Sequence, residues 1–251
     1  MNDKTTDLQL TGQSSSVVMI SLNEERAIAR VVNDIRRVVP DAEIVVVDSS
    51  SDRTAEIATE LGCVVVKQFP PKGYGMAMDK ALTTASRDIV ITLDCDDTYP
   101  VESIHELIRK MNEGYDLVSG SRLGHRPDAM PFPNYLANML FGILAGAICG
   151  VRSTDVHTGM RAYRKSLIKS FPYKPEGPAL PVELQVGPAA LGFKCYEFFI
   201  DYKPRIGESK LEKWSSTVWT IKRLWRWRFF FNPEKATVKK QLAAQLTGAV
   251  K

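Results

Sequence analysis

Three carboxylates occur within four residues, at a point where an apolar strand is expected to end. Asp94, Asp96 and Asp97 follow the run Ile89-Val90-Ile91-Thr92. Clustered carboxylates repel each other, and their burial without partners costs roughly several kcal/mol. A hard divalent cation is the simplest partner, because Mg²⁺ binds one or two carboxylates together with substrate phosphates. A solvated acidic turn that caps a helix is the alternative, since Asp is common at helix N-termini.

Two more acidic residues follow apolar runs and are candidates for the same site. Glu24 comes after the run 17–22, and Asp48 ends the run 43–48. Ligands of open α/β sheets bind beyond the carboxyl ends of the strands. We therefore expect Glu24 and Asp48 to face one crevice together with Asp94 and Asp96.

A glycine-containing turn, Lys72-Gly73-Tyr74-Gly75, follows a further apolar run and points to the same edge of the expected sheet. Its glycines would let the backbone approach a phosphate closely, with Lys72 as the counter-charge. An ordinary turn is the alternative. No GxGxxG follows the first strand and no GxxxxGK[ST] occurs, which disfavours dinucleotide oxidoreductases and P-loop NTPases.

The elements that must position these residues alternate regularly through the first half of the chain. Strands are expected at 17–22, 43–48, 64–66, 88–93 and 116–120, and helices at 23–39, 54–61, 76–85 and 101–112. Nearly unbroken apolar strands suit a sheet whose two faces are both covered by helices. Strict strand–helix alternation predicts an α/β fold with a parallel sheet and right-handed crossovers.

The second half of the chain is less regular. We expect a proline-containing loop at 125–133, helices at 134–149, near 166, at 181–191 and at 215–231, and strands at 158–163 and 194–202. The predicted organisation is a disordered N-terminus (1–14), a catalytic domain (15–211), a basic aromatic helix (212–231) and a tail of uncertain structure (232–251).

The composition is that of a soluble globular protein with one large domain. The chain has 251 residues, of which 44% are hydrophobic and 25% are charged, enough for a sizeable core. The four cysteines form no CxxC pair, which fits reduced cytosolic thiols better than zinc or disulfides. No signal peptide is visible, and no apolar run reaches the roughly eighteen residues that span a bilayer. The longest candidate is 135–151.

The C-terminal part is basic. Residues 201–251 contain twelve Lys or Arg against four Asp or Glu, which suggests an anionic partner. Trp and Phe alternate with Lys and Arg in the segment 214–231, a pattern that suits a helix lying in the membrane interface. The alternative is a helix packed on the catalytic domain with solvated arginines. The apolar helix at 134–149 is either a second membrane-facing element or part of the core.

Taken together, the motifs resemble the family 2 glycosyltransferases with a GT-A fold. The first half matches at Ser21-Leu22-Asn23-Glu24-Glu25, at 47–54, at 72–77 and at the DxD motif Asp94-Cys95-Asp96. The second half is similar to dolichyl-phosphate mannose or glucose synthases and their bacterial polyprenyl-phosphate counterparts. It matches at Gly120-Ser121-Arg122, at the D-x-x-[ST]-G-x-R-x-[YF] block 155–163, at Glu183 and at the R-x-G-E-S-K-[LM] block 205–211.

The resemblance covers about residues 17–211. It implies a Rossmann-like GT-A fold, with a mixed, mainly parallel sheet flanked by helices and a C-terminal amphipathic helix. It also implies contacts to a nucleotide sugar from Ile20, Leu22, Glu24, Asp48, Lys72, Asp94 and Cys95. Asp94 and Asp96 would hold Mg²⁺ or Mn²⁺ on the diphosphate, where negative charge develops as the nucleoside diphosphate departs.

The same resemblance implies an acceptor that carries a phosphate. Arg122, Arg161, Arg205 and Lys210 would supply positive charge for that phosphate. A phosphate monoester has a second pKa of about 6, so it needs little help from a general base. The expected reaction is one in-line displacement with inversion at the anomeric carbon.

Three acidic residues have two interpretations each. Asp155 either orients the acceptor or caps a turn. Glu183 is expected to be a structural partner of a nearby arginine rather than a catalytic base. Asp97 lies outside the DxD motif, and we expect it to cap the helix after Pro100. Many relatives have Gln where this chain has Thr98 beside the metal.

The hypothesis from the sequence is therefore an enzyme that transfers mannose or glucose from a GDP- or UDP-sugar to a polyprenyl or dolichyl phosphate. It would be peripheral, at the cytoplasmic face of a membrane. One alternative is a family 2 glycosyltransferase with a soluble acceptor, and another is a non-catalytic membrane-binding or nucleic-acid-binding module. No nucleic-acid motif is visible, so we expect no nucleic-acid partner. A nucleotidyltransferase is disfavoured, because its usual glycine-rich N-terminal loop is missing.

Overall fold

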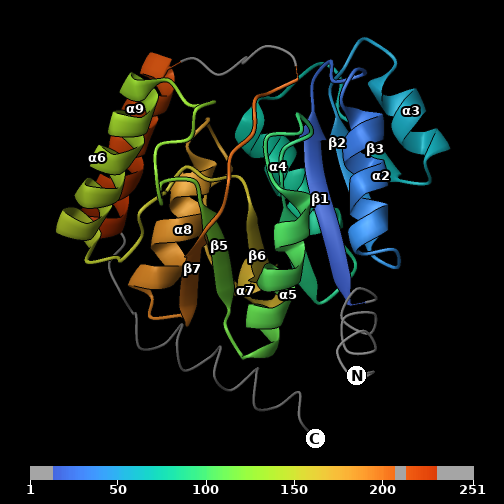
Figure 1. Ribbon diagram of the computed structural model, residues 1–251. Coiled ribbons are helices and arrows are strands. Elements are labelled where there is room, and N and C mark those ends of the chain that lie inside the picture. The colour runs from blue at the N-terminus through green and yellow to red at the C-terminus, as the bar shows by residue number, and fades with distance from the viewer. Residues whose placement is uncertain (1–13, 207–212, 231–251) are drawn as a thin grey trace, which may run out of the picture.

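The computed structural model describes residues 14–206 and 213–230, and a seven-stranded sheet forms its centre (Figure 1). The strands lie in the order β3-β2-β1-β4-β6-β5-β7. Their bounds are β1 Ser15–Ser21, β2 Glu43–Asp48, β3 Val64–Lys67, β4 Ile89–Thr92, β5 Leu117–Ser121, β6 Arg161–Arg164 and β7 Cys195–Phe199.

The sheet is mixed and mainly parallel, as predicted. Strand β6 lies antiparallel between β4 and β5, and the other neighbouring strands are parallel. In the β4–β6 register Thr92 is opposite Arg161. The loop before β6 therefore ends beside the segment after β4, which brings residues more than sixty positions apart to the same edge of the sheet.

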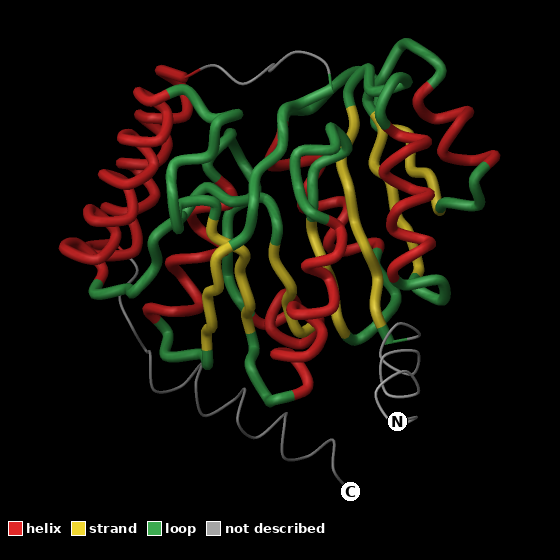
Figure 2. The backbone as a smooth tube through the Cα atoms, in the orientation of Figure 1, coloured by secondary structure: helices red, strands yellow, loops and turns green. Residues whose placement is uncertain are grey.

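Helices cover both faces of the sheet (Figure 2). Their bounds are α2 Ile28–Val38, α3 Thr54–Glu60, α4 Tyr74–Thr84, α5 Ile104–Asn112, α6 Phe132–Cys149, α7 Lys165–Ser170, α8 Leu180–Ala190 and α9 Lys213–Trp225. Two short segments, η1 Val101–Ser103 and η2 Arg226–Phe230, complete the list. Alternate residues of β1 enter opposite cores: Met19 packs with α2 and α5, and Val18 packs with α4 and α8.

The first helix begins later than the sequence suggested. It was expected from Asn23, but α2 begins at Ile28. Asn23 has a left-handed backbone with φ of 57°, and its side-chain oxygen accepts a hydrogen bond from the Ser51 N–H at 2.9 Å. Asn is one of the few residues that tolerate this conformation. The segment after β1 is thus held as a loop against the segment after β2.

Helices α6 and α9 lie side by side at one edge of the molecule (Figure 1). Helix α6 has 18 residues, of which only Gly142 and Ala145 are buried, and it is long and apolar enough to cross a membrane by length and composition. The expectation that no segment reaches this length was therefore wrong. The helix begins at Phe132, after the N-cap residue Pro131, and Pro133 lies in its first turn, a position that tolerates proline.

The expected basic aromatic helix is confirmed as α9, followed by the π-helical turn η2. Both pack on α8. The predicted disordered N-terminus and C-terminal tail fall almost entirely on residues 1–13 and 231–251, and these lie outside the described residues. The proposed domain boundaries at 211 and 231 remain predictions.

Candidate active site

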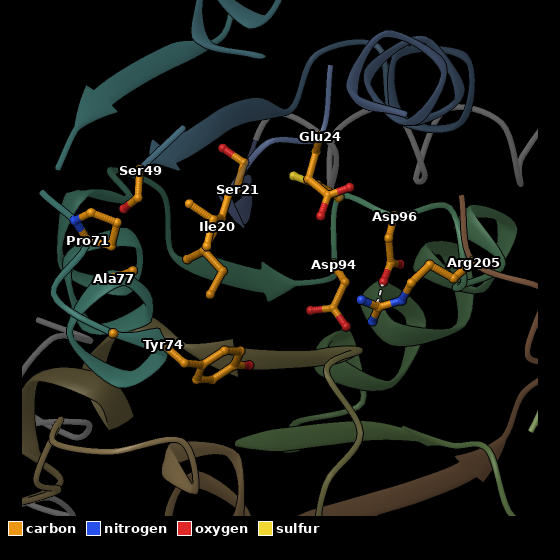
Figure 3. Close-up of a pocket in the computed structure, with 13 residues that line it drawn as sticks. Ile20, Ser21, Glu24, Ser49, Pro71, Tyr74, Ala77, Asp94, Asp96 and Arg205 are labelled. Carbon is orange, nitrogen blue, oxygen red and sulfur yellow. Dashed lines mark ion pairs between the residues drawn. The ribbon is translucent and has the colours of Figure 1, made fainter. Parts of the chain in front are cut away.

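A cavity of about 330 Å³ opens at the carboxyl ends of β1, β2 and β4, and the start of α4 closes one side (Figure 3). Its lining comes from five separate segments: Ile20, Ser21, Leu22 and Glu24; Ser49; Pro71, Gly73, Tyr74 and Ala77; Asp94, Cys95 and Asp96; and Arg205. The predicted residues Ile20, Leu22, Glu24, Asp94, Cys95, Asp96 and Arg205 thus come together in one place.

Asp94 is the carboxylate without a partner. Within residues 14–206 and 213–230 no group donates a hydrogen bond to it and no cation forms an ion pair with it. Burial, followed by the negative charge of Asp96, raises the pKa of Asp94 to about 7. Such a group gains most from a positive ligand in the cavity.

Asp96 is held in place by its neighbours. Its Oδ1 accepts hydrogen bonds from the Thr98 hydroxyl at 2.6 Å and the Thr98 N–H at 3.1 Å. Its Oδ2 forms an ion pair of 2.6 Å with Arg205 (Figure 3). The segment after β7 that carries Arg205 is tied to the same loop, since the Ile206 N–H donates to the Asp96 carbonyl oxygen at 3.0 Å. Thr98 therefore orients the second carboxylate of the DxD motif.

Asp97 does not cap the helix after Pro100, so that prediction was wrong. The following 3-10 turn has no side-chain cap, and Asp97 has a left-handed backbone with φ of 62°. This turn points the side chain back toward α2, where it forms an ion pair of 3.1 Å with Arg30.

Asp48 lies at the end of β2 beside the cavity but does not line it. Its carboxylate accepts hydrogen bonds from the Ser21 hydroxyl at 2.8 Å and the Ser50 N–H at 3.2 Å, and it forms an ion pair of 2.6 Å with Lys67. Burial favours a higher pKa, but these three donors outweigh it and hold the pKa of Asp48 below its usual value. Its predicted contact with the nucleobase stays a prediction.

The glycine-containing turn contributes to the cavity in a different way from that expected. Gly73 has φ of 91°, and it and Tyr74 line the cavity, whereas Lys72 lies in a separate depression with Lys67 and Lys80. Figure 3 shows the Tyr74 ring reaching across the cavity toward Asp94. Tyr74 was not among the residues expected at the site; its place between two glycines just before an expected helix was the available signal.

Arg122 and Asp155 form a buried pair away from the cavity. Arg122 donates to Asp155 through Nε at 2.6 Å and Nη2 at 2.9 Å, and through its backbone N–H at 3.2 Å. Burial favours a higher pKa for Asp155, but the Arg122 charge holds it below its usual value. Asp155 also accepts a hydrogen bond from the His157 N–H at 3.2 Å. It therefore caps this turn, which was one of its two expected roles.

Arg161 is buried, and its hydrogen bonds go to backbone carbonyl oxygens. Its guanidinium donates to the carbonyl oxygens of Pro181 at 2.7 Å and Val156 at 2.9 Å. It therefore ties the loop before β6 to the start of α8, and it does not line the cavity. A contact between Arg161 and an acceptor phosphate stays a prediction. Lys210, the last of the predicted cations, lies outside the described residues.

Glu183 is a structural partner of arginines, as predicted. It is fully buried on α8 and forms ion pairs with Arg223 of α9 and Arg226 of η2. A buried carboxylate needs such partners. The pairing fixes the C-terminal helix on the catalytic domain.

Comparisons with known proteins agree with this geometry. The model of glycosyl transferase family 2 matches residues 16–171. A dolichyl-phosphate hexose transferase of Haloferax volcanii is 42% identical over 205 residues, which are 81% of this chain and 89% of that protein. The low-salt glycan biosynthesis hexosyltransferase Agl6 of the same organism is 33% identical over 78% of this chain and 49% of its own length.

Solved structures show the same fold. Glucosyl-3-phosphoglycerate synthase of Mycobacterium tuberculosis with phosphoglyceric acid has a TM-score of 0.69 at 24% identity, covering 91% of this chain and 85% of that one. The same enzyme with Mn²⁺, UDP and glucosyl-3-phosphoglycerate has a TM-score of 0.68 at 23% identity over equal shares. The predicted GT-A fold is thus confirmed. From its family match, its relatives and its fold, the chain belongs to glycosyl transferase family 2 and is a glycosyltransferase.

Proposed function

We propose that this enzyme transfers a hexose from a GDP- or UDP-sugar to a polyprenyl or dolichyl phosphate, with inversion at the anomeric carbon. The observation that carries the proposal is the unpartnered Asp94 beside Asp96 and Arg205, in a cavity at the carboxyl ends of the strands. The name of the Haloferax relative supports the acceptor.

The carboxylates of Asp94 and Asp96 fit a divalent cation. The described ranges contain no group of three or more His, Cys, Asp or Glu that could hold a metal by protein ligands alone. Mg²⁺ and Mn²⁺ suit a site with one or two carboxylates that substrate phosphates complete. A bound cation would neutralise charge on the diphosphate of the donor.

The chain's own residues would then position and release the donor. Tyr74 and Gly73 form the wall against which the nucleotide sugar lies. Arg205, held by Asp96, places a guanidinium where a phosphate group of donor or acceptor would lie, and its planar fork suits phosphate oxygens. An ionised phosphate is the attacking group, so no protein base is required.

The acceptor's lipid chain would bring the enzyme to a membrane surface. Helix α6 exposes Leu140 and Ile143, and α9 exposes Trp214, Ile221 and Trp225. These two helices lie side by side. Exposed apolar side chains gathered in this way mark an interaction surface, and tryptophans favour the headgroup region of a bilayer.

The test uses the purified full chain with radiolabelled UDP-glucose, GDP-mannose or their hexose counterparts, Mn²⁺ and polyprenyl phosphate in detergent. We expect label to partition into the organic phase with one nucleotide sugar and to stay in water when the polyprenyl phosphate is omitted. NMR of the product should show an anomeric configuration opposite to that of the donor.

Transfer to phosphoglyceric acid, with no label in the organic phase for any donor, would instead establish a soluble acceptor and overturn the proposal. The proposal would also be contradicted if the folded protein, shown to unfold cooperatively, transferred label neither to polyprenyl phosphate nor to phosphoglyceric acid.

A further inference from the structure

We propose that the loop 171–179, between α7 and α8, transmits the position of α9 to the donor cavity, and that Arg223 and Gly75 are positioning residues for the nucleotide. The inference rests on the proposed function, since it takes the cavity as the nucleotide site. The loop contacts α9 on one side and the N-terminal turn of α4 on the other.

On the α9 side, one guanidinium holds the loop by its backbone. Arg223 Nη2 donates to the carbonyl oxygens of Lys174, at 2.9 Å, and Glu176. The same side chain forms an ion pair with Glu183, which accepts the Lys174 N–H at 3.2 Å. Arginine alone offers several fixed donors for such a set of acceptors. The loop backbone is therefore fixed relative to both α8 and α9.

The loop also packs directly on the face of α9. Gly177 has φ of 79°, and a Cβ at this position would come within 2.6 Å of the Trp219 ring. Only glycine combines this backbone conformation with so close an approach. No side chain therefore separates the loop from α9 at Gly177.

On the α4 side, the contact is between backbones. A Cβ on Gly75 would overlap the carbonyl oxygen of Pro175 and lie 2.6 Å from that of Gly177. A second tie comes from the Tyr173 hydroxyl, which donates to Asp79 of α4 at 2.7 Å. The helix start is thus packed against the loop without space for movement.

The residues on either side of Gly75 line the donor cavity. Gly73, Tyr74 and Ala77 are all part of its wall, and Gly75 belongs to the same helical turn. A shift of the loop toward α4 would move this turn, and a shift away would leave it unsupported. Since α9 also carries exposed tryptophans, the position of the surface helix and the shape of the nucleotide site are linked through Arg223.

The test is calorimetric binding of UDP and GDP, each with Mn²⁺, to the full chain and its variants. Arg223→Lys keeps a charge beside Glu183 but has one nitrogen where arginine uses two, Nη1 for Glu183 and Nη2 for the carbonyl oxygens. Gly75→Ala adds one methyl group at the loop contact without touching α9. We expect each to weaken nucleotide binding about 5-fold or more, the lower end of coupling between linked sites. Arg228→Lys, on the exposed side of η2, is the matched control and should bind as the wild type does.

Thermal unfolding of each variant separates the positioning role from a purely structural one. A lower Tm with nucleotide affinity within about twofold of wild type, in both variants, would overturn the inference and leave the proposed function standing. If Gly75→Ala does not fold, Arg223→Lys decides. If the wild type binds neither nucleotide, the proposed function fails and the inference fails with it.

Discussion

Two acidic residues near the same edge of the sheet have opposite surroundings. Asp94, after β4, faces the cavity with no hydrogen-bond or ion-pair partner among the described residues, and its pKa is raised to about 7. Asp155, in the loop before β6, forms an ion pair with Arg122, which lowers its pKa. Both are aspartates in motifs of the family, so the motif alone does not distinguish their roles. Arg122 supplies the counter-charge for Asp155, whereas the charges of Arg205 and Arg122 do not offset the burial of Asp94, which a positive ligand in the cavity would stabilise.

The same contrast separates Asp94 from Glu183. At the end of β4, Asp94 lines the cavity, and among the described residues it has no ion-pair partner. Around α8 and α9 the buried Glu183 is matched by Arg223 and Arg226 within the protein. Matched buried charges specify how elements pack, and unmatched ones mark functional sites.

The largest expected effect is on catalysis at the unmatched carboxylate. Asp94→Asn should lower kcat about 10²–10³-fold or more, as removal of one group that stabilises developing charge does. It should not lower the free energy of unfolding at neutral pH in chelator, because the carboxylate it removes has no ion-pair partner within residues 14–206 and 213–230. Transfer assays and urea unfolding measure the two effects. An unfolding free energy that falls along with the activity would show that Asp94 is structural.

Asp155→Ala should have the reverse profile. It leaves the Arg122 guanidinium buried and unpaired, a change that costs about 3–5 kcal/mol of stability. Urea unfolding measures it, and Asp155→Asn, which keeps the size of the side chain, is the matched comparison. A stable Asp155→Ala protein without activity would instead place Asp155 in direct contact with the substrate.

The pH dependence of stability should reveal the two buried environments as opposite slopes. The His157 ring packs on Phe141 and forms a hydrogen bond with the Thr220 hydroxyl. Burial lowers the pKa of His157 to about 4. The unfolded state takes up this proton first, near pH 6.5, so His157 removes about 3 kcal/mol of stability as the pH falls to 4. Asp94 acts in the other direction, because its folded pKa is the higher one, and stability is gained as the pH falls below about 7.

Single variants should separate these slopes. In chelator, His157→Gln should become more stable relative to wild type as the pH falls from 6.5 to 4, and Asp94→Asn should become less stable relative to wild type over the same range. Guanidinium unfolding at five or six pH values measures both differences. Parallel curves for a variant and the wild type would mean that its group keeps its ordinary pKa in the folded state.

The smallest expected effect on stability is at the exposed edge. The double substitution Leu140→Glu and Ile143→Glu on α6 should change the free energy of unfolding by less than about 0.5 kcal/mol, as exposed positions do. It should nevertheless reduce co-sedimentation with vesicles that contain anionic lipid. Val64→Glu, an exposed apolar position on the edge strand β3, is the control. Equal vesicle binding by all three proteins would exclude the α6 surface as a membrane contact.

Much of the fold and the position of the DxD motif could be predicted from the sequence, because the relevant signals are local. Strand Ile89–Thr92 and the face of α2 formed by Ile28, Val31 and Ile35 follow from residue spacing alone. The DxD motif directly follows its strand, so its place at the sheet edge was predictable too. Asp97 was not, because its left-handed backbone and its partner Arg30 depend on α2 packing beside the loop.

What the sequence determined by itself was the order of elements, the family and the residues at the carboxyl ends of the strands. The tertiary structure decided which charges are satisfied. Arg122 meets Asp155 across 33 positions and Glu183 meets Arg223 across 40, while Lys72 lies outside the cavity that Tyr74 lines. The energy of a charge depends on its nearest counter-charge and its exposure to water, and both are set by packing between distant segments.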